Sequence, residues 1–135
     1  MKSTSPWSVE TSQQVDELIL ESVRSTGDRR RLAALAGQAI EQLINNGLGA
    51  NGVKKLNDVD LYEIRVGDYR LYLKLVGKGS RTIAVSVLAP KLTGQLPTKT
   101  YRTYERRVDE HIAEIRARED ASSRRADAGK AGRSK

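Results

Sequence analysis

The chain has 135 residues and a formal net charge of +7, with 38% hydrophobic residues, no cysteine and one histidine, His111. This composition excludes a disulfide framework, a cysteine nucleophile and a multi-histidine metal site. Because the sequence has neither an apolar run of about 18 residues nor a signal-peptide core near Met1, we expect one soluble, cytoplasmic domain that needs no metal and no cofactor.

The positive charge is concentrated in the second part of the chain. Residues 1–52 carry 5 Lys and Arg against 6 Asp and Glu, whereas residues 53–135 carry 19 against 11. Such an asymmetry is typical of a surface that binds nucleic acid or, failing that, an acidic protein.

Two helices are predicted in the first part of the chain, after a short edge strand at residues 6–10. Thr11 and Gln14 form a capping box for a helix that ends at Gly27. Its apolar residues recur at helical spacing: Val15, Leu18, Ile19 and Val23.

Asp28 is a suitable N-cap for the second helix, which Gly47 terminates. Its stripe consists of Leu32, Leu35, Ala36, Ala39, Ile40, Leu43 and Ile44. We expect the two helices to form a hairpin packed on a sheet.

A β-hairpin follows the glycine-rich residues 47–52, which lack the ending of a phosphate loop and are interpreted as a linker. The turn signal is Gly67-Asp68, because glycine at the first turn position suits a type II′ turn. Its predicted pairs are Val66 with Tyr69, Arg65 with Arg70, Ile64 with Leu71 and Glu63 with Tyr72. Alternation then places Ile64, Val66, Tyr69, Leu71 and Leu73 on an apolar face, and Glu63, Arg65, Arg70, Tyr72 and Lys74 on a cationic one.

The opposed arginines of this hairpin need an explanation, because like charges in a directly opposed pair are destabilising. Either Glu63 bridges Arg65 and Arg70, or the pair is kept for a phosphate. The alternative without any ligand is a solvated salt-bridge ladder made of Glu63, Arg65, Arg70 and Lys74.

Three strands are predicted after the linker, at about residues 60–66, 69–76 and 81–88, and together they form an antiparallel meander. On the third strand, Ile83, Val85 and Val87 are assigned to the apolar face. Thr82, Ala84 and Ser86 are small, so they leave room for a ligand on the cationic face.

The C-terminal part begins with a loop over residues 90–97, after which Thr98 can cap a third helix. Its apolar side carries Tyr101, Tyr104, Val108, Ile112 and Ile115. His111 lies in this helix and is interpreted as a partly exposed residue. From residue 120 the sequence has no apolar periodicity, so we divide the chain into a domain at 1–119 and a disordered basic tail at 120–135.

The order of these elements and the segment Leu61-Tyr-Glu-Ile-Arg-Val-Gly-Asp-Tyr-Arg70 resemble the RelE/ParE superfamily of type II toxins, over about residues 9–91. The resemblance implies an α+β fold in which an N-terminal helical hairpin packs on a small curved antiparallel sheet. It also implies a partner, a cognate antitoxin that wraps the toxin. RelE-like members cut messenger RNA on the ribosome, whereas ParE-like members inhibit DNA gyrase.

The same resemblance implies roles for individual residues. Arg65, Arg70, Lys91 and Tyr101 would be catalytic, and Lys54 and Lys55 would bind RNA. Tyr72 and Lys74 are expected to bind RNA as well, because they belong to the predicted cationic face. Two positions depart from the family's pattern. The first tyrosine after the last strand, Tyr101, comes late, so either Tyr101 or Tyr104 would fill the role of the family's tyrosine, and Glu63 stands where the family has a second lysine.

The chemistry of RNA cleavage explains how such residues work without histidine or metal. Arg70 would clamp the phosphate, Arg65 or Lys54 would neutralise developing charge, and Lys91 or a tyrosine would transfer a proton if neighbouring cations lowered its pKa. We therefore expect a RelE-like, ribosome-dependent mRNA endoribonuclease that inhibits translation. The alternatives are a ParE-like gyrase inhibitor and a catalytically silent RNA- or protein-binding module.

Overall fold

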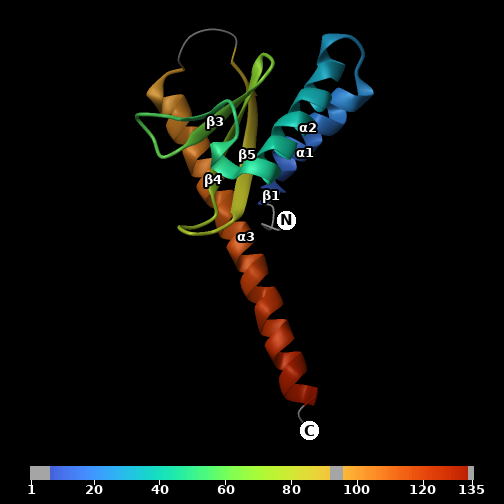
Figure 1. Ribbon diagram of the computed structural model, residues 1–135, viewed down its shortest axis with the longest axis vertical. Coiled ribbons are helices and arrows are strands. Elements are labelled where there is room, and N and C mark those ends of the chain that lie inside the picture. Colours follow the sequence, from blue (N-terminus) through green and yellow to red (C-terminus); the bar gives the residue numbers. More distant parts are fainter. Residues whose placement is uncertain (1–6, 92–95, 134–135) are drawn as a thin grey trace.

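The computed structural model describes residues 7–91 and 96–133, with the side chains of residues 28 and 125–133 left out. Its sheet is flanked by helices on both faces (Figure 1). The elements, in chain order, are β1 (Ser8–Thr11), α1 (Gln13–Arg24), α2 (Asp28–Asn46), the 3-10 turn η1 (Gly47–Gly49), β2 (Val53–Lys55), β3 (Tyr62–Val66), β4 (Tyr69–Leu75), β5 (Thr82–Pro90) and α3 (Thr98–Arg133).

The predicted α+β class and the helical hairpin are confirmed, but the sheet is mixed. Its strand order is β1-β5-β4-β3-β2, and β1 pairs with β5 in parallel while the other pairs are antiparallel. The expected edge strand is β1, whereas β2 was not among the predicted strands. With only three residues, β2 is too short for alternation to be visible in the sequence.

The register of the central hairpin is as predicted. Val66 faces Tyr69, Arg65 faces Arg70, Ile64 faces Leu71 and Glu63 faces Tyr72. Gly67 has a φ of 62° at the turn, a conformation that glycine adopts without strain. The predicted apolar face packs against α1 and α2 in a first core that contains Val15, Leu32, Ala36, Leu43, Ile64, Val66, Leu71, Leu73, Val85 and Leu88.

The opposite face of the sheet is covered by α3, so the prediction of an open cationic face is wrong. Tyr72 is fully buried and Glu63 is 5% exposed. A second core lies between this face and α3, and its members include Leu56, Val59, Leu61, Tyr72, Val87, Tyr101, Val108, Ile112 and Ile115. The sequence shows the apolar side of α3 but not its partner, because the two are far apart along the chain.

A register shift changes which side chains of β5 point to each core. Tyr72 pairs with Val87 but Leu73 pairs with Val85, so Ser86 is an extra residue in β5. Val87 therefore joins the second core, not the first as predicted, and Leu88 takes its place in the first core. Simple alternation fails here because a bulge inverts the side-chain pattern beyond it.

The starts of α1 and α2 differ from the sequence prediction by one residue, and the predicted end of α1 at Gly27 is wrong. α1 ends at Arg24 with Ser25 as its C-cap, because Gly27 serves as the N-cap of α2. Thr11 is still paired with Val85 in the sheet, so Ser12 is the N-cap of α1, and its side chain accepts a hydrogen bond from the backbone N–H of Val15 at 3.3 Å. The N-cap of α2 is Gly27, and Asp28 is its first residue. The predicted end of α2 is confirmed, because Gly47 is its C-cap.

The third helix continues beyond the domain boundary expected at residue 120. Its backbone is helical to Arg133, and its last turns extend past the sheet (Figure 1). Alanine and arginine are good helix formers, so this segment has local helix propensity although it lacks an apolar stripe. The division of the chain at residue 120 stays a prediction, and residues 92–95 of the expected loop lie outside the described residues.

His111 is buried between α3 and β5, so its interpretation as a partly exposed residue is wrong. It is 6% exposed, and its Nδ1 lies 2.7 Å from the hydroxyl of Ser86, the bulged residue. Burial lowers the pKa of His111 below its ordinary value of 6.5; the Arg118 charge acts in the same direction, against Glu114, Glu10 and Asp16.

This lowered pKa predicts a loss of stability in mild acid. The unfolded chain takes up a proton near pH 6.5 while the folded chain resists it, so the contribution of His111 is complete above pH 6.5 and is lost as the pH falls toward the folded pKa. Denaturant unfolding between about pH 5.5 and 7.5 measures this. In the variant His111→Gln the pH dependence should become flatter, and an identical slope in both proteins would contradict the assignment.

Candidate functional site

Glu63 is the centre of a polar cluster under the first turns of α3. Its two carboxylate oxygens lie 3.1 and 3.2 Å from the Nζ of Lys91, and Oε1 lies 3.9 Å from the Nε of Arg70. Lys91 follows β5 directly, and its backbone N–H donates to the carbonyl of Asp68 at 2.8 Å. We call Glu63, Arg70, Tyr72, Lys91 and Tyr101 the Glu63 cluster.

The two opposed arginines are held by the turn between their strands. The Nη1 of Arg70 donates to the carbonyls of Tyr69 at 2.9 Å and of Gly67 at 3.2 Å, and the Nε of Arg65 donates to the same Gly67 carbonyl at 3.3 Å. Glu63 therefore bridges Arg70 and Lys91 instead of the two arginines. Arg65 is exposed at the end of the hairpin, while Arg70 keeps 16% of its side-chain surface open.

Tyr101 and Tyr72 form the covered side of the cluster. Tyr101 is 2% exposed, accepts a hydrogen bond from the backbone N–H of Leu96 at 3.2 Å, and has the Nζ of Lys91 5.7 Å from its ring centre. The ring of Tyr72 packs against those of Tyr101 and Tyr104, at centroid distances of 6.1 and 4.7 Å. Its hydroxyl is buried against the Glu63 carboxylate, which raises its pKa, yet among the described residues no contact of this hydroxyl has the geometry of a full hydrogen bond.

The contacts of the Glu63 cluster raise the pKa of two of its groups, Lys91 and Tyr72. Burial acts to lower the pKa of Lys91, but the contacts with Tyr101 and Glu63 outweigh it and raise the pKa. Burial and then the charge of Glu63 raise the pKa of Tyr72 far above its ordinary value. At neutral pH Lys91 is therefore a cation and Tyr72 is a neutral hydroxyl.

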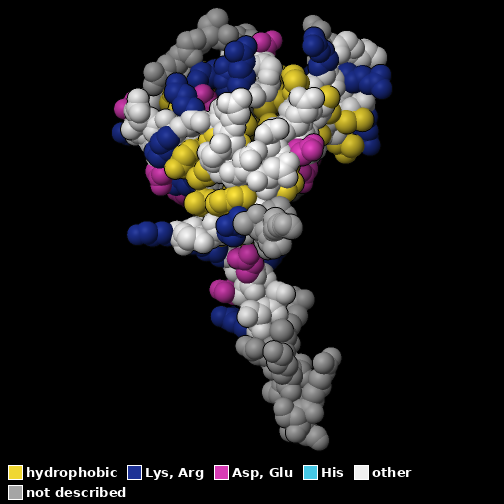
Figure 2. Space-filling model, viewed as in Figure 1, with side chains coloured by type: hydrophobic (Ala, Val, Ile, Leu, Met, Phe, Trp, Pro, Cys, Tyr) yellow, Lys and Arg dark blue, Asp and Glu magenta, His cyan; other side chains and the backbone are white. Residues whose placement is uncertain are grey.

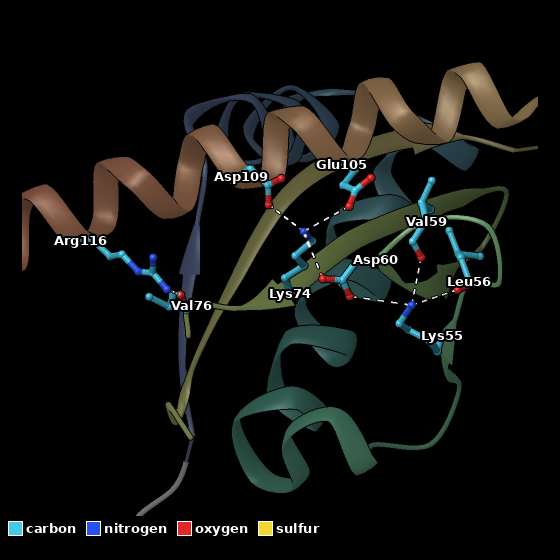
Figure 3. Close-up of polar contacts among 9 residues, drawn as sticks. All are labelled: Lys55, Leu56, Val59, Asp60, Lys74, Val76, Glu105, Asp109 and Arg116. Carbon is cyan, nitrogen blue, oxygen red and sulfur yellow. Dashed lines mark hydrogen bonds and ion pairs between the residues drawn. The ribbon is translucent and has the colours of Figure 1, made fainter. Parts of the chain in front are cut away.

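Lys55 and Lys74 belong to a second cluster, in which carboxylates neutralise them (Figure 3). The Nζ of Lys74 lies 2.7 Å from Asp109, 3.5 Å from Glu105 and 3.6 Å from Asp60. Burial acts to lower the pKa of Lys74, but Asp109 and the other carboxylates raise it. We call these five residues the Lys74 cluster.

The Lys74 cluster joins three segments that are distant in sequence. The Nζ of Lys55 donates to the carbonyls of Leu56 at 3.1 Å and Val59 at 2.9 Å, and it lies 3.8 Å from Asp60 (Figure 3). Lys55 thus holds the loop between β2 and β3, and Lys74 holds the same loop to α3. Both lysines have structural partners within the chain.

The structure thus brings together half of the predicted site residues. Arg70, Tyr72, Lys91 and Tyr101 meet around Glu63, whereas Lys55 and Lys74 form the separate cluster. Arg65 lies near the helical hairpin, and Lys54 is exposed on the edge strand β2, opposite Glu63 in register. Sequence reasoning missed the central place of Glu63, although its position across from Tyr72 in the predicted hairpin was a usable signal.

Two surface pockets lie between α2 and the central hairpin, on the other side of the sheet. One of about 460 Å³ is lined by Arg29, Arg31, Leu32, Leu35 and residues 66–69. The other, of about 350 Å³, includes Arg65 and Gln42. Figure 2 shows Lys and Arg side chains gathered at the end of the molecule that carries the β3–β4 turn and the α1–α2 connection.

Within the described residues, no group of three or more His, Cys, Asp or Glu side chains is placed to hold a metal ion. No helix in the same part of the chain is both long and apolar enough to cross a membrane.

The sequence matches no protein-family model and no curated protein. Comparison with solved structures finds a chain of the toxin–antitoxin complex RelBE2 from Mycobacterium tuberculosis, with a TM-score of 0.47 and 18% identity, covering 64% of this chain and 99% of that chain. A chain of the archaeal RelE–RelB complex from Pyrococcus horikoshii matches with a TM-score of 0.48 and 19% identity, covering 66% of this chain and 99% of that chain. Both complexes are of the kind that the sequence resemblance names, and about a third of this chain lies outside each match.

The two tyrosines of the Glu63 cluster predict opposite effects of removing a hydroxyl. Tyr101→Phe removes an acceptor from the backbone N–H of Leu96 and should lower the free energy of unfolding by about 1 kcal/mol. Tyr72→Phe removes a hydroxyl that has no described partner, so it should leave stability unchanged or raise it. Denaturant unfolding of both variants tests this, and a larger loss for Tyr72→Phe would show that its hydroxyl has a partner after all.

Proposed function

We propose that this chain is the toxin of a type II toxin–antitoxin system and acts as a RelE-like, ribosome-dependent mRNA endoribonuclease that inhibits translation. The observation that carries the proposal is the convergence of Arg70 and Lys91 at one end of the sheet, with Tyr101 over Lys91. These residues come from three separate parts of the chain. Arg70 and Lys91 match basic positions of the resembling family, and Tyr101 is one of the two tyrosines, with Tyr104, that could match its tyrosine.

The chemistry of this cluster fits stabilisation of a phosphorane by fixed positive charge. Removal of such a contact typically costs about 2–4 kcal/mol at the transition state. Arg70 would hold the phosphate oxygens, and Lys91, which stays protonated, would neutralise the developing charge or protonate the leaving oxygen. Tyr72 would contribute a hydrogen bond. Deprotonation of the ribose hydroxyl is left to a group outside this pair of cations.

A ParE-like gyrase inhibitor is the second candidate, and one observation favours it. Glu63 already pairs with both Arg70 and Lys91, whose side chains are only 16% and 11% exposed. A site whose cations already share a carboxylate of the same chain is less suited to bind RNA, so the surface around it would instead contact a protein. The same observation fits the other alternative, a catalytically silent module that binds RNA or protein.

A cognate antitoxin is the partner that the proposal requires. Leu20 and Val23 are apolar residues of α1 that are 51% and 55% exposed. On α2, Arg29 and Arg31 border the larger pocket, which has an apolar floor. An acidic amphipathic segment complements such a surface, because it offers both carboxylates and apolar anchors.

The experiment that tests the nuclease proposal is translation in vitro, followed by primer extension on the message. The chain should produce codon-spaced cuts only when ribosomes are present, and Arg70→Ala should reduce the cutting rate by about 10²–10³-fold. Arg24→Ala, at an exposed position at the end of α1, is the control and should cut normally.

Because Arg70 is half-buried, circular dichroism must show that Arg70→Ala is folded. Growth arrest with intact messages and inhibited gyrase would overturn the nuclease proposal in favour of the second candidate. Cutting by folded Arg70→Ala at the rate of the parent would instead show that the site is misassigned.

A further inference from the structure

Glu63 stands between the two cations that the proposed function assigns to a phosphate. We propose that Arg70 and Lys91 form an anion-binding site, that the Glu63 carboxylate occupies it as an internal competitor, and that the external ligand is a phosphate group. The inference rests on the proposed function for the source of that phosphate, an RNA backbone. The site itself is argued from the geometry of the Glu63 cluster.

The carboxylate satisfies Lys91 well and Arg70 poorly. Both oxygens of Glu63 are within 3.2 Å of the Lys91 Nζ, but the nearest approach to Arg70 is 3.9 Å, which is too long for a hydrogen bond. A guanidinium binds best to an anion that offers two oxygens in its own plane. Glu63 cannot do this for Arg70 while both of its oxygens face Lys91, so part of the guanidinium remains available.

The buried hydroxyl of Tyr72 is a second, independent observation. It lies against the Glu63 carboxylate, which raises its pKa, but this contact does not have the geometry of a full hydrogen bond, and no other described group is a partner. Buried polar groups nearly always have partners, and leaving one unpaired costs about 1–3 kcal/mol. A phosphate group has more acceptor oxygens than a carboxylate, so it can accept from Tyr72 while it also contacts Arg70 and Lys91.

The balance of charge separates the Glu63 cluster from the Lys74 cluster. In the Glu63 cluster two cations share one carboxylate. In the Lys74 cluster three carboxylates, those of Asp60, Glu105 and Asp109, face two lysines. Only the Glu63 cluster carries excess positive charge in a partly buried place, where charges are screened less than at the surface. An external anion should therefore bind there and not at Lys74.

The variant Glu63→Gln tests the inference with inorganic phosphate as the probe. It removes the competing charge and nearly preserves the shape of the side chain. In sodium chloride its melting temperature should fall below that of the parent, because Arg70 and Lys91 repel each other. In sodium phosphate of equal ionic strength it should recover by roughly 3 °C or more, because the anion binds the folded state. The parent should gain less from the exchange of salts.

Asp60→Asn is the matched control, because it removes the same charge from the Lys74 cluster. It should show no phosphate-specific recovery, and neither should the double variant Glu63→Gln with Lys91→Met. If Glu63→Gln does not fold, Glu63→Asp keeps the charge but withdraws the carboxylate from Lys91, and it should gain more from phosphate than the parent does. An equal response of the parent, Asp60→Asn and the Glu63 variants would overturn the inference.

The same variants separate failure of this inference from failure of the proposed function. If phosphate specifically stabilises Glu63→Gln but neither it nor the parent cuts ribosome-bound message, the anion site stands and the nuclease proposal fails. If the parent cuts message and phosphate has no specific effect on Glu63→Gln, the nuclease proposal stands and the inference fails. When both hold, Glu63→Gln should also bind RNA with a steeper dependence on salt than the parent.

Discussion

The docking of α3 on the second face of the sheet is the interaction on which the rest of the structure depends. Without it Tyr72, Val87 and the loop between β2 and β3 would have no core to join. Burial of each large apolar side chain is worth about 1.5–3 kcal/mol, more than a typical exposed ion pair at about 0–1 kcal/mol. The apolar contacts of α3 therefore provide most of the free energy of its docking, while the polar contacts determine where along the sheet the helix lies.

Those polar contacts are distributed along the helix. Lys74 binds Glu105 and Asp109, and farther along the helix Arg116 donates to the carbonyl of Val76 (Figure 3). Between these two places His111 meets the bulged Ser86. The contact of His111 with Ser86 provides a partner for two buried polar side chains. The contacts of Lys74 and Arg116 provide partners for two charged side chains close to the second core. The bulge in β5 and α3 thus fit together, because Ser86, the extra residue in the strand, carries the hydroxyl that faces His111.

The same docking sets the electrostatics of the candidate site. A face that would have been open and cationic becomes covered, so its cations require partners inside the chain. At Lys74 the carboxylates of the helix and the loop provide them in excess. At Arg70 and Lys91 a single glutamate serves both, and a buried tyrosine hydroxyl next to it has no described partner. This imbalance is the difference between the proposed anion site at the Glu63 cluster and the ion-pair network of the Lys74 cluster.

The sequence was sufficient where the determinants are local. Gly67-Asp68 and the alternation around it predicted the register of the hairpin, and Gly47 marked the end of α2. The sequence was insufficient where the interacting residues are distant along the chain. Four features depend on segments that meet only in the fold: the short strand β2, the bulge at Ser86, the burial of His111 and the neutralisation of Lys74. Arg70, Lys91 and Tyr101, which were predicted to be catalytic, meet in the fold, and their roles stay a prediction. Tyr72 lies with them although the sequence placed it among the RNA-binding residues, and Glu63 was considered as a bridge between arginines and not as the centre.

A crystal structure of Glu63→Gln grown in phosphate tests most directly the claim that the covered face carries an anion site. The account predicts a phosphate in contact with the Arg70 guanidinium and the Lys91 ammonium, with the Tyr72 hydroxyl donating to it and α3 in place above. A phosphate bound at Lys74 or at the pocket beside Arg31, with Arg70 and Lys91 free of any anion, would contradict it.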